Sequence, residues 1–139
     1  MQWTREDGYT ITTDLDRVDF GVVHAFLTES YWSPGVSRDV VERAARGSLT
    51  FSLRGPEDEQ AGYARAVSDL ATYAYLADVF VLEPHRGSGL GVWLVETILA
   101  HPDLQGLRRW ALATGDAHGL YSRFGFGPPR RPELHMFRE

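Results

Sequence analysis

The chain has 139 residues and no cysteine, which suits a single domain over residues 1–139 and excludes disulfides, thiolate metal sites and a cysteine nucleophile. A net charge of −5 without a basic cluster argues against a nucleic-acid partner. No apolar run reaches the roughly 18 residues of a membrane span and no signal peptide opens the chain, so we expect a cytoplasmic protein with no membrane partner.

Hydrophobic periodicity, turn residues and helix caps divide the chain into alternating elements. In chain order the predicted elements are a strand (9–13), two helices (18–28 and 37–47), three strands (48–53, 61–67 and 72–82), a helix (90–100), a strand (107–113), a helix (116–124) and a strand (134–137). Residues 1–8 are polar and are expected to fray or to lead into the first strand. Asp14 or Asp16 is expected to cap the first helix, and Ser37 the second. This order predicts an α+β domain with a mostly antiparallel sheet.

Residues 79–94, V-F-V-L-E-P-H-R-G-S-G-L-G-V-W-L, form the stretch around which the chain is organised. A buried strand breaks at Pro84, passes through three glycines and becomes a helix with one apolar face. Glycines at a strand-to-helix junction let the backbone turn sharply and present N–H groups to a ligand. The positive end of the helix points at the same place, so the pattern predicts a site for phosphate oxygens. The alternative is a tight turn that binds nothing.

Two known phosphate motifs do not fit this stretch: no Lys follows Gly91 as a P-loop requires, and the glycine order is not that of a dinucleotide fingerprint. The order R-x-x-G-x-G instead resembles the pyrophosphate loop of the GNAT superfamily of acyl-CoA N-acyltransferases. The segment G-L-Y-S-R-F-G-F, residues 119–126, resembles the LYxxxGF segment of the same family. The resemblance implies a GNAT-like fold, with a mixed sheet splayed at a cofactor cleft and about four flanking helices.

This resemblance also implies acetyl-CoA as the cofactor and transfer of its acetyl group to a primary amine by direct attack in a ternary complex. Strand backbone would bond the pantetheine arm, and the glycine loop with Arg86 would hold the pyrophosphate. Thr114 stands where many relatives have an asparagine that bonds the pantetheine. The implied cofactor contacts are Phe80, Val81, Leu82, Arg86, Gly87, Ser88, Gly89, Leu90, Gly91, Thr114 and Tyr121.

Two residues are the leading candidates for catalysis. Tyr121 occupies the tyrosine position of the family motif and would protonate the departing thiolate; the alternative is an amphipathic core tyrosine. Asp78 interrupts an apolar strand, and a buried acid needs a partner or a purpose. It would bind or deprotonate the amine, or else make a structural hydrogen bond. His118 is a second candidate base or a surface histidine.

The sequence gives less information about the residues that bind the acceptor than about the other parts of the site. Candidate acceptor-binding residues are Tyr31, Trp32, Arg65, Tyr73 and Tyr75. The Tyr31–Trp32 pair either closes over a substrate or packs under the second helix. Arg65 binds an acceptor carboxylate or pairs with Asp78 or Asp69. The remaining histidines lack metal-ligand spacing, so no metal is expected.

Several alternatives stay open at this level. The acceptor is a small-molecule or peptide amine, and the protein is a monomer or a homodimer, with exchange of the C-terminal strand one route to the dimer. A non-catalytic CoA-binding sensor or a GNAT-shaped interaction domain would keep the glycine loop but would need neither Tyr121 nor Asp78. A binding module for another phosphorylated ligand is a third interpretation.

Overall fold

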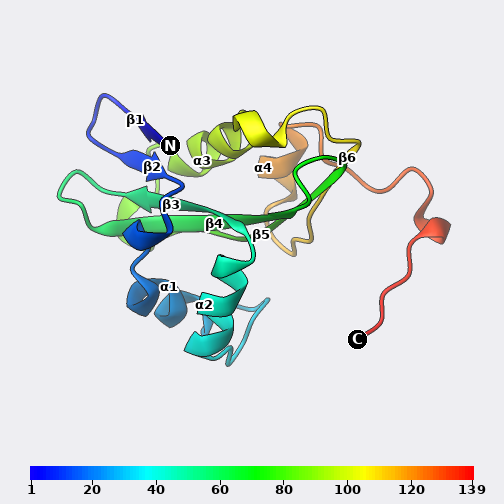
Figure 1. Cartoon of the computed structure of the whole chain (residues 1–139), viewed down its shortest axis with the longest axis horizontal. Coiled ribbons are helices and arrows are strands. Elements are labelled where there is room, and N and C mark those ends of the chain that lie inside the picture. Colours follow the sequence, from blue (N-terminus) through cyan, green and yellow to red (C-terminus); the bar gives the residue numbers. More distant parts are fainter.

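A mixed six-stranded sheet with helices on both faces forms the body of the molecule (Figure 1), and the computed structural model describes all 139 residues. The strands, in their order across the sheet, are β1 (Gln2–Thr4), β2 (Thr10–Thr12), β3 (Leu49–Arg54), β4 (Gln60–Ser68), β5 (Tyr73–Val81) and β6 (Arg109–Ala111). The helices are α1 (Phe20–Leu27), α2 (Arg38–Arg46), α3 (Leu90–Leu99) and α4 (His118–Ser122). Only the β5–β6 pair is parallel. The α+β class and the mostly antiparallel sheet are therefore confirmed. None of the helices has the length and hydrophobicity needed to cross a bilayer.

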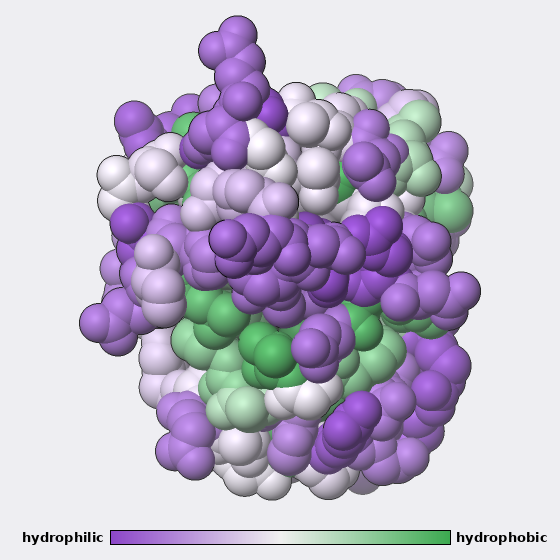
Figure 2. Space-filling view, turned by 90° about the vertical axis from the view of Figure 1, so that its left-hand side faces the viewer, coloured by the Kyte–Doolittle hydropathy of each residue, from purple (hydrophilic) through white to green (hydrophobic).

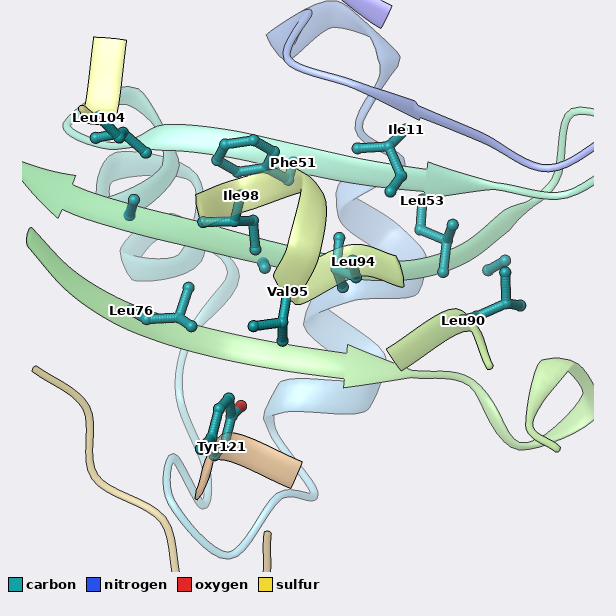
Figure 3. Close-up of a cluster of buried hydrophobic side chains, with 13 residues drawn as sticks. Ile11, Phe51, Leu53, Leu76, Leu90, Leu94, Val95, Ile98, Leu104 and Tyr121 are labelled. Atoms are coloured by element: carbon teal, nitrogen blue, oxygen red, sulfur yellow. The ribbon is translucent and has the colours of Figure 1, made fainter. Parts of the chain in front are cut away.

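The larger core lies between α3 and the sheet. Leu94, Val95 and Ile98 have no exposed surface, because the apolar face of α3 recurs every three to four residues. These side chains pack against strand residues such as Phe51 and Leu76 (Figure 3). Their packing fixes where α3 begins, and with it the glycine loop that precedes the helix.

A second, smaller core lies on the opposite face, under α1 and α2. Its buried members are Val18, Val23, Leu27, Val41, Tyr63 and Phe80. Several neighbouring apolar side chains, including Phe20, Phe26 and Leu82, are only partly buried. Figure 2 shows the end of the molecule that lies at the left of Figure 1. On this end an apolar area lies below a hydrophilic band.

The helix caps agree with the prediction at α2 and differ from it at α1. The Ser37 side chain accepts a hydrogen bond from the Val40 N–H and caps α2 as predicted. Asp14 caps a separate 3₁₀ turn, Leu15–Arg17, and Asp19 caps α1 by accepting from the Val22 N–H. The prediction that Asp14 or Asp16 caps the first helix was wrong because the chain turns before that helix starts.

Residues 1–8 do not fray, and they hold a strand that the sequence analysis did not predict. β1 pairs antiparallel with β2, and Gly8 takes the positive φ of +91° that the connecting turn requires. Trp3 stacks on Phe51 with ring centroids 6.4 Å apart and also lies against His101. These aromatic contacts of the partly buried Trp3 anchor a short polar strand that shows little periodicity of its own.

The predicted final strand at 134–137 was wrong. The chain forms a 3₁₀ turn, Pro132–Leu134, and then leaves the body as an unpaired tail (Figure 1). Leu134, Met136 and Phe137 are 61%, 93% and 89% exposed. The local pattern is strand-like, but a strand needs a neighbouring backbone to bond, and within one chain this segment has none.

The stability of the domain depends on the core under α3. Leu94→Ala should lower the free energy of unfolding by about 2–5 kcal/mol, because the removed side chain is fully buried and leaves a cavity. Denaturant unfolding would measure this change. Val40→Ala on α2, a site that is 42% exposed, should change it by no more than about 0.5 kcal/mol. Equal effects of the two substitutions would contradict this account of the core.

Candidate functional site

A one-residue bulge in β5 lies at the centre of the site. Tyr63 faces Phe80 and Arg65 faces Ala77, so β5 holds one more residue than β4 between these pairs. Asp78 lies in the bulge with a positive φ of +55°. Because side chains alternate across a sheet, one extra residue reverses the faces of everything after it. Leu76 belongs to the α3 core before the bulge, and Phe80 belongs to the α1–α2 core after it.

Beyond the bulge, β5 separates from β6 and opens a cleft. The two strands pair only as far as Tyr75 and Ala111, and β5 then continues to Val81 without a neighbour on that side. A cavity of about 360 Å³ fills the fork. Its lining includes Tyr31, Trp32, Arg65, Tyr75, Asp78, Val79, Thr114, Asp116 and Tyr121. The structure therefore brings Tyr121, Asp78 and four of the five predicted acceptor residues to one cavity, while Tyr73 lies outside it.

The glycine loop has the geometry of an anion site. Gly87 and Gly89 have φ of +92° and +78°, and a Cβ at either position, or at Gly91, would meet no atom within 4 Å. The backbone N–H groups of residues 87–92 donate to no protein acceptor. They lie at the N-terminus of α3, where the helix dipole favours negative charge, above a hollow of about 240 Å³. The residues present thus fit the diphosphate of a coenzyme A molecule.

Side chains from the distant β1–β2 hairpin hold this loop in place. An Arg5 Nη1 group donates to the Ser88 carbonyl at 3.1 Å, and the guanidinium lies 5.4 Å from the Trp93 ring centroid. The Tyr9 hydroxyl and His85 Nδ1 are 2.7 Å apart. The sequence analysis missed these contacts because 83 residues separate Arg5 from Ser88 and no local pattern links them.

Arg86 turns back toward the sheet. Its Nε donates to the Val81 carbonyl at 2.8 Å. Arg86 and Val81 both border the hollow beside the glycine loop and a neighbouring cavity of about 310 Å³. The two other guanidinium nitrogens of Arg86 have no protein partner, so they are available to an anion.

The Asp78 carboxylate is bound by two neighbours. Oδ2 accepts from Arg65 Nε at 2.6 Å, and Oδ1 accepts from the Trp32 indole N–H at 3.0 Å. The Arg65 and Asp78 side chains are 20% and 12% exposed, so this ion pair is largely removed from water. Of the two alternatives for Arg65, the structure has the ion pair with Asp78.

Tyr31 bridges the mouth of the cleft. Its hydroxyl accepts from the Gly115 N–H at 2.7 Å and donates to Asp116 Oδ1 at 3.2 Å. With Trp32 bonded to Asp78, the aromatic pair connects β5 to the segment before α4, and it does not pack under α2. Asp116 does not cap α4, and the Thr114 hydroxyl accepts from the N–H groups of residues 116 and 117.

Tyr121 is buried in α4, at the point where the cleft meets a second hollow. It lines both the 360 Å³ cavity and a neighbouring hollow of about 530 Å³, which His118 also lines. No protein group hydrogen-bonds to its hydroxyl. Burial, with smaller contributions from the neighbouring Tyr31 and Asp116, raises the pKa of Tyr121 to about 12. The side chain is therefore a neutral hydrogen-bond donor at physiological pH.

Comparison with known proteins places this geometry in a family. The family model described as "Acetyltransferase (GNAT) family" matches residues 11–126, which is most of the chain. This chain belongs to the GNAT acetyltransferase family. A protein of Gibberella zeae named as an inferred acetyltransferase is 32% identical over 88% of this chain and 80% of its own length.

Solved structures agree with the family assignment. The crystal structure of an inferred GNAT acetyltransferase from Xanthomonas campestris is 43% identical, covers 99% of this chain and 95% of its own, and has a TM-score of 0.92. A Clostridium acetobutylicum protein described as a predicted acetyltransferase with acetyl-CoA shares the fold, with a TM-score of 0.64 over 94% of this chain and 92% of its own at 11% identity. The expected GNAT fold is thereby confirmed.

The ion pair in the cleft should stabilise this GNAT domain. Asp78→Asn keeps a residue that tolerates positive φ but leaves Arg65 charged and unpaired, and should cost up to about 3 kcal/mol of unfolding free energy. Denaturant unfolding would measure it, and Arg65→Met with Asp78→Asn should recover part of the loss.

The exposed Arg43–Asp39 pair on α2 provides the matched control. Its side chains are 63% and 74% exposed, so Asp39→Asn should cost no more than about 0.5 kcal/mol. If Asp78→Asn costs no more than Asp39→Asn, the ion pair in the cleft has no structural role.

Proposed function

We propose that this GNAT protein transfers the acetyl group of acetyl-CoA to a primary amine, by direct attack within a ternary complex. The observation that carries the proposal is a row of adjoining cavities between two chemically distinct ends. The hollow at the glycine loop shares Val81 and Arg86 with the 310 Å³ cavity. That cavity shares Tyr31, Trp32, Val79 and Asp116 with the 360 Å³ cavity that holds Tyr121. An elongated ligand with a phosphate end and a reactive end suits this arrangement.

The glycine loop would bind the diphosphate of acetyl-CoA through its free N–H groups and Arg86. The end of β5 at Phe80 and Val81 would bond the pantetheine arm as an added strand does. The predicted contact at Leu82 is already occupied, because its N–H donates to the Ala61 carbonyl and its own carbonyl accepts from the His85 N–H. The Val81 carbonyl accepts one hydrogen bond from Arg86 Nε, and its second lone pair is available to the arm. Thr114 remains a proposed contact, with its hydroxyl proton free while its oxygen accepts from two N–H groups.

The bound thioester supplies an activated acetyl carbonyl to the site. In the proposed reaction the amine nitrogen bonds to that carbonyl carbon, the carbon–sulfur bond breaks, and Tyr121 gives a proton to the departing sulfur. A backbone N–H of Phe80 or Val81 would hold the carbonyl oxygen as charge develops on it.

The acceptor must also lose a proton, and Asp78 is the proposed base. Its two oxygens each accept one hydrogen bond, from Arg65 and from Trp32, so the proton would be taken by a lone pair that these bonds leave free. If Asp78 is the base, Asp78→Asn should remove an ionisation limb from the pH profile of kcat/KM. A retained limb would assign deprotonation to another group, such as His118 or water.

The cavity favours an acceptor in which an ammonium group lies next to an apolar group. The rings of Tyr31, Trp32 and Tyr75 line it together with the carboxylates of Asp78 and Asp116. Aromatic faces and carboxylates both attract an ammonium group. A small-molecule or peptide amine is therefore the proposed acceptor, with Arg65 as a further contact.

Acetyl-CoA should raise the melting temperature. A ligand at about 100 times its Kd adds roughly 2.7 kcal/mol, which is several degrees for a domain of this size. Gly89→Glu should abolish the shift, because it places bulk and negative charge in the open space above the loop. Gly89→Ala is the matched control, since it introduces the same strain at φ +78° without the charge. A full rise in the melting temperature of Gly89→Glu would show that acetyl-CoA binds away from the glycine loop.

Tyr121→Phe should lower kcat by about 10²- to 10⁴-fold with little change in the melting shift, because it removes a proton donor and keeps the ring. Release of CoA thiol over a panel of amines would measure turnover. Since the pKa of Tyr121 is about 12, the wild-type rate should show no loss from its ionisation below about pH 10. Wild-type turnover in Tyr121→Phe would rule out the acid role, and binding without turnover on any amine would favour a CoA sensor.

A further inference from the structure

Three charged side chains line the 360 Å³ cavity, and two of them neutralise one another. Arg65 and Asp78 form an ion pair with Nε and Oδ2 2.6 Å apart, and both side chains are mostly buried. Asp116, the third, forms no ion pair. Because the Arg65–Asp78 pair is neutral as a unit, the cavity keeps a net negative charge, and this charge lies at Asp116.

Arg65 is already engaged on two sides. Its Nε donates to Asp78, and its Nη1 donates to Ser48 Oγ at 3.2 Å. A negatively charged acceptor would therefore find only part of one guanidinium in this cavity. The remaining lining is mainly apolar and aromatic, and it includes the rings of Tyr31, Trp32, Tyr75 and Tyr121. Aromatic walls and one uncompensated carboxylate suit a positively charged ligand with an apolar chain.

The Asp116 carboxylate is held in position at the mouth of the cleft. Oδ1 accepts from the Tyr31 hydroxyl at 3.2 Å, and that hydroxyl accepts from the Gly115 N–H at 2.7 Å. The Tyr31 ring lies so close to residue 115 that a Cβ there would be 3.3 Å from it. Oδ2 of Asp116 has no protein partner, so the carboxylate can bind a cation without losing these contacts.

The aromatic pair of Tyr31 and Trp32 connects Asp116 to Asp78. The Trp32 indole N–H donates to Asp78 Oδ1 at 3.0 Å, while the Tyr31 hydroxyl donates to Asp116. The two rings meet edge to face, with centroids 5.1 Å apart. Asp78 reaches the cavity from β5 and Asp116 from the segment that follows β6. A ligand that lies along the aromatic pair therefore has a carboxylate near each end.

The reacting nitrogen of an acceptor needs only one of these carboxylates. An amine attacks a thioester as the free base, so its positive charge is lost before the bond forms, and Asp78 is the proposed recipient of the proton. A second carboxylate beside the same nitrogen would favour the protonated, unreactive form. Asp116 can stabilise a positive charge throughout the reaction only if that charge lies on another atom of the acceptor.

We propose that the acceptor is an aliphatic diamine and that Asp116 binds the ammonium group that does not react. This inference rests on the proposed acetyl transfer, because it concerns the same acceptor cavity. One amine attacks the acetyl carbonyl near Tyr121, the aliphatic chain lies against the rings of Tyr31 and Trp32, and the second ammonium binds Asp116 at the mouth. Asp116 then determines specificity, because it selects substrates by a charge remote from the reacting atoms.

The first test compares terminal diamines of increasing chain length with matched monoamines, in which a methyl group replaces the second amine. In a thiol-release assay, wild-type kcat/KM should be about 10- to 100-fold higher for at least one diamine than for its monoamine, as expected for a hydrogen bond to a charged group. Asp116→Asn keeps the shape of the side chain and should remove most of this preference. The loss should lie mainly in KM, because the second ammonium is bound equally before and during the reaction.

Asp16→Asn is the matched control. Asp16 is an exposed aspartate that forms no ion pair and lies outside the cavity lining. Its substitution changes the net charge by the same amount as Asp116→Asn and should keep the preference for the diamine. A wild type without this preference, or a preference that Asp116→Asn retains, would overturn the inference.

The second test measures binding without turnover, in the presence of free CoA. At equal concentration a diamine should raise the melting temperature more than its monoamine, and Asp116→Asn should remove this difference while Asp16→Asn keeps it. This result with no turnover of any amine would support the cation site at Asp116 and overturn the proposed acetyl transfer. Turnover of monoamines and diamines at equal kcat/KM, or equal rises in melting temperature, would overturn the role of Asp116.

Discussion

The bulge at Asp78 is the constraint on which the site depends. One extra residue in β5 sends Leu76 and Phe80 to opposite faces of the sheet, so a single strand supplies both cores. The same residue carries the carboxylate that joins Arg65 of β4 to Trp32 of the α1–α2 loop. Without the bulge, the side chains after residue 78 would reverse, and both cores would lose their complementarity. The bulge therefore couples the stability of the domain to the shape of its cleft.

The two helical layers have different roles in building the cleft. On one face, α3 is fixed by deep packing, and its N-terminus carries the free N–H groups of the glycine loop. On the other face, α1 and α2 pack over a smaller core and hold Tyr31 and Trp32 across the fork between β5 and β6. The glycine loop thus rests on the layer with the larger buried core. The proposed acceptor end depends on a loop, where variation costs less packing energy.

Contacts between distant segments complete the site at several points. Arg5, in the turn after β1, bonds the glycine loop, and Tyr31 bonds the segment before α4. Each of these side chains is exposed or partly exposed and has no periodic signature in the sequence. The sheet order places the N-terminal hairpin and β6 at opposite edges. Each contact is therefore made by a separate side chain that reaches from one segment to another distant in the sequence.

The sequence by itself determined the α+β class, the glycine loop before α3 and the motif around Tyr121, because local periodicity, caps and glycine spacing are encoded within a few neighbouring residues. It did not determine β1, which depends on the contact of Trp3 with Phe51, nor the unpaired state of segment 134–137. The tertiary structure alone decided that Arg65 pairs with Asp78 and that Asp116 faces Tyr31 and caps no helix. Strand pairing and ion pairing join residues far apart in the chain, and no local pattern specifies the partner.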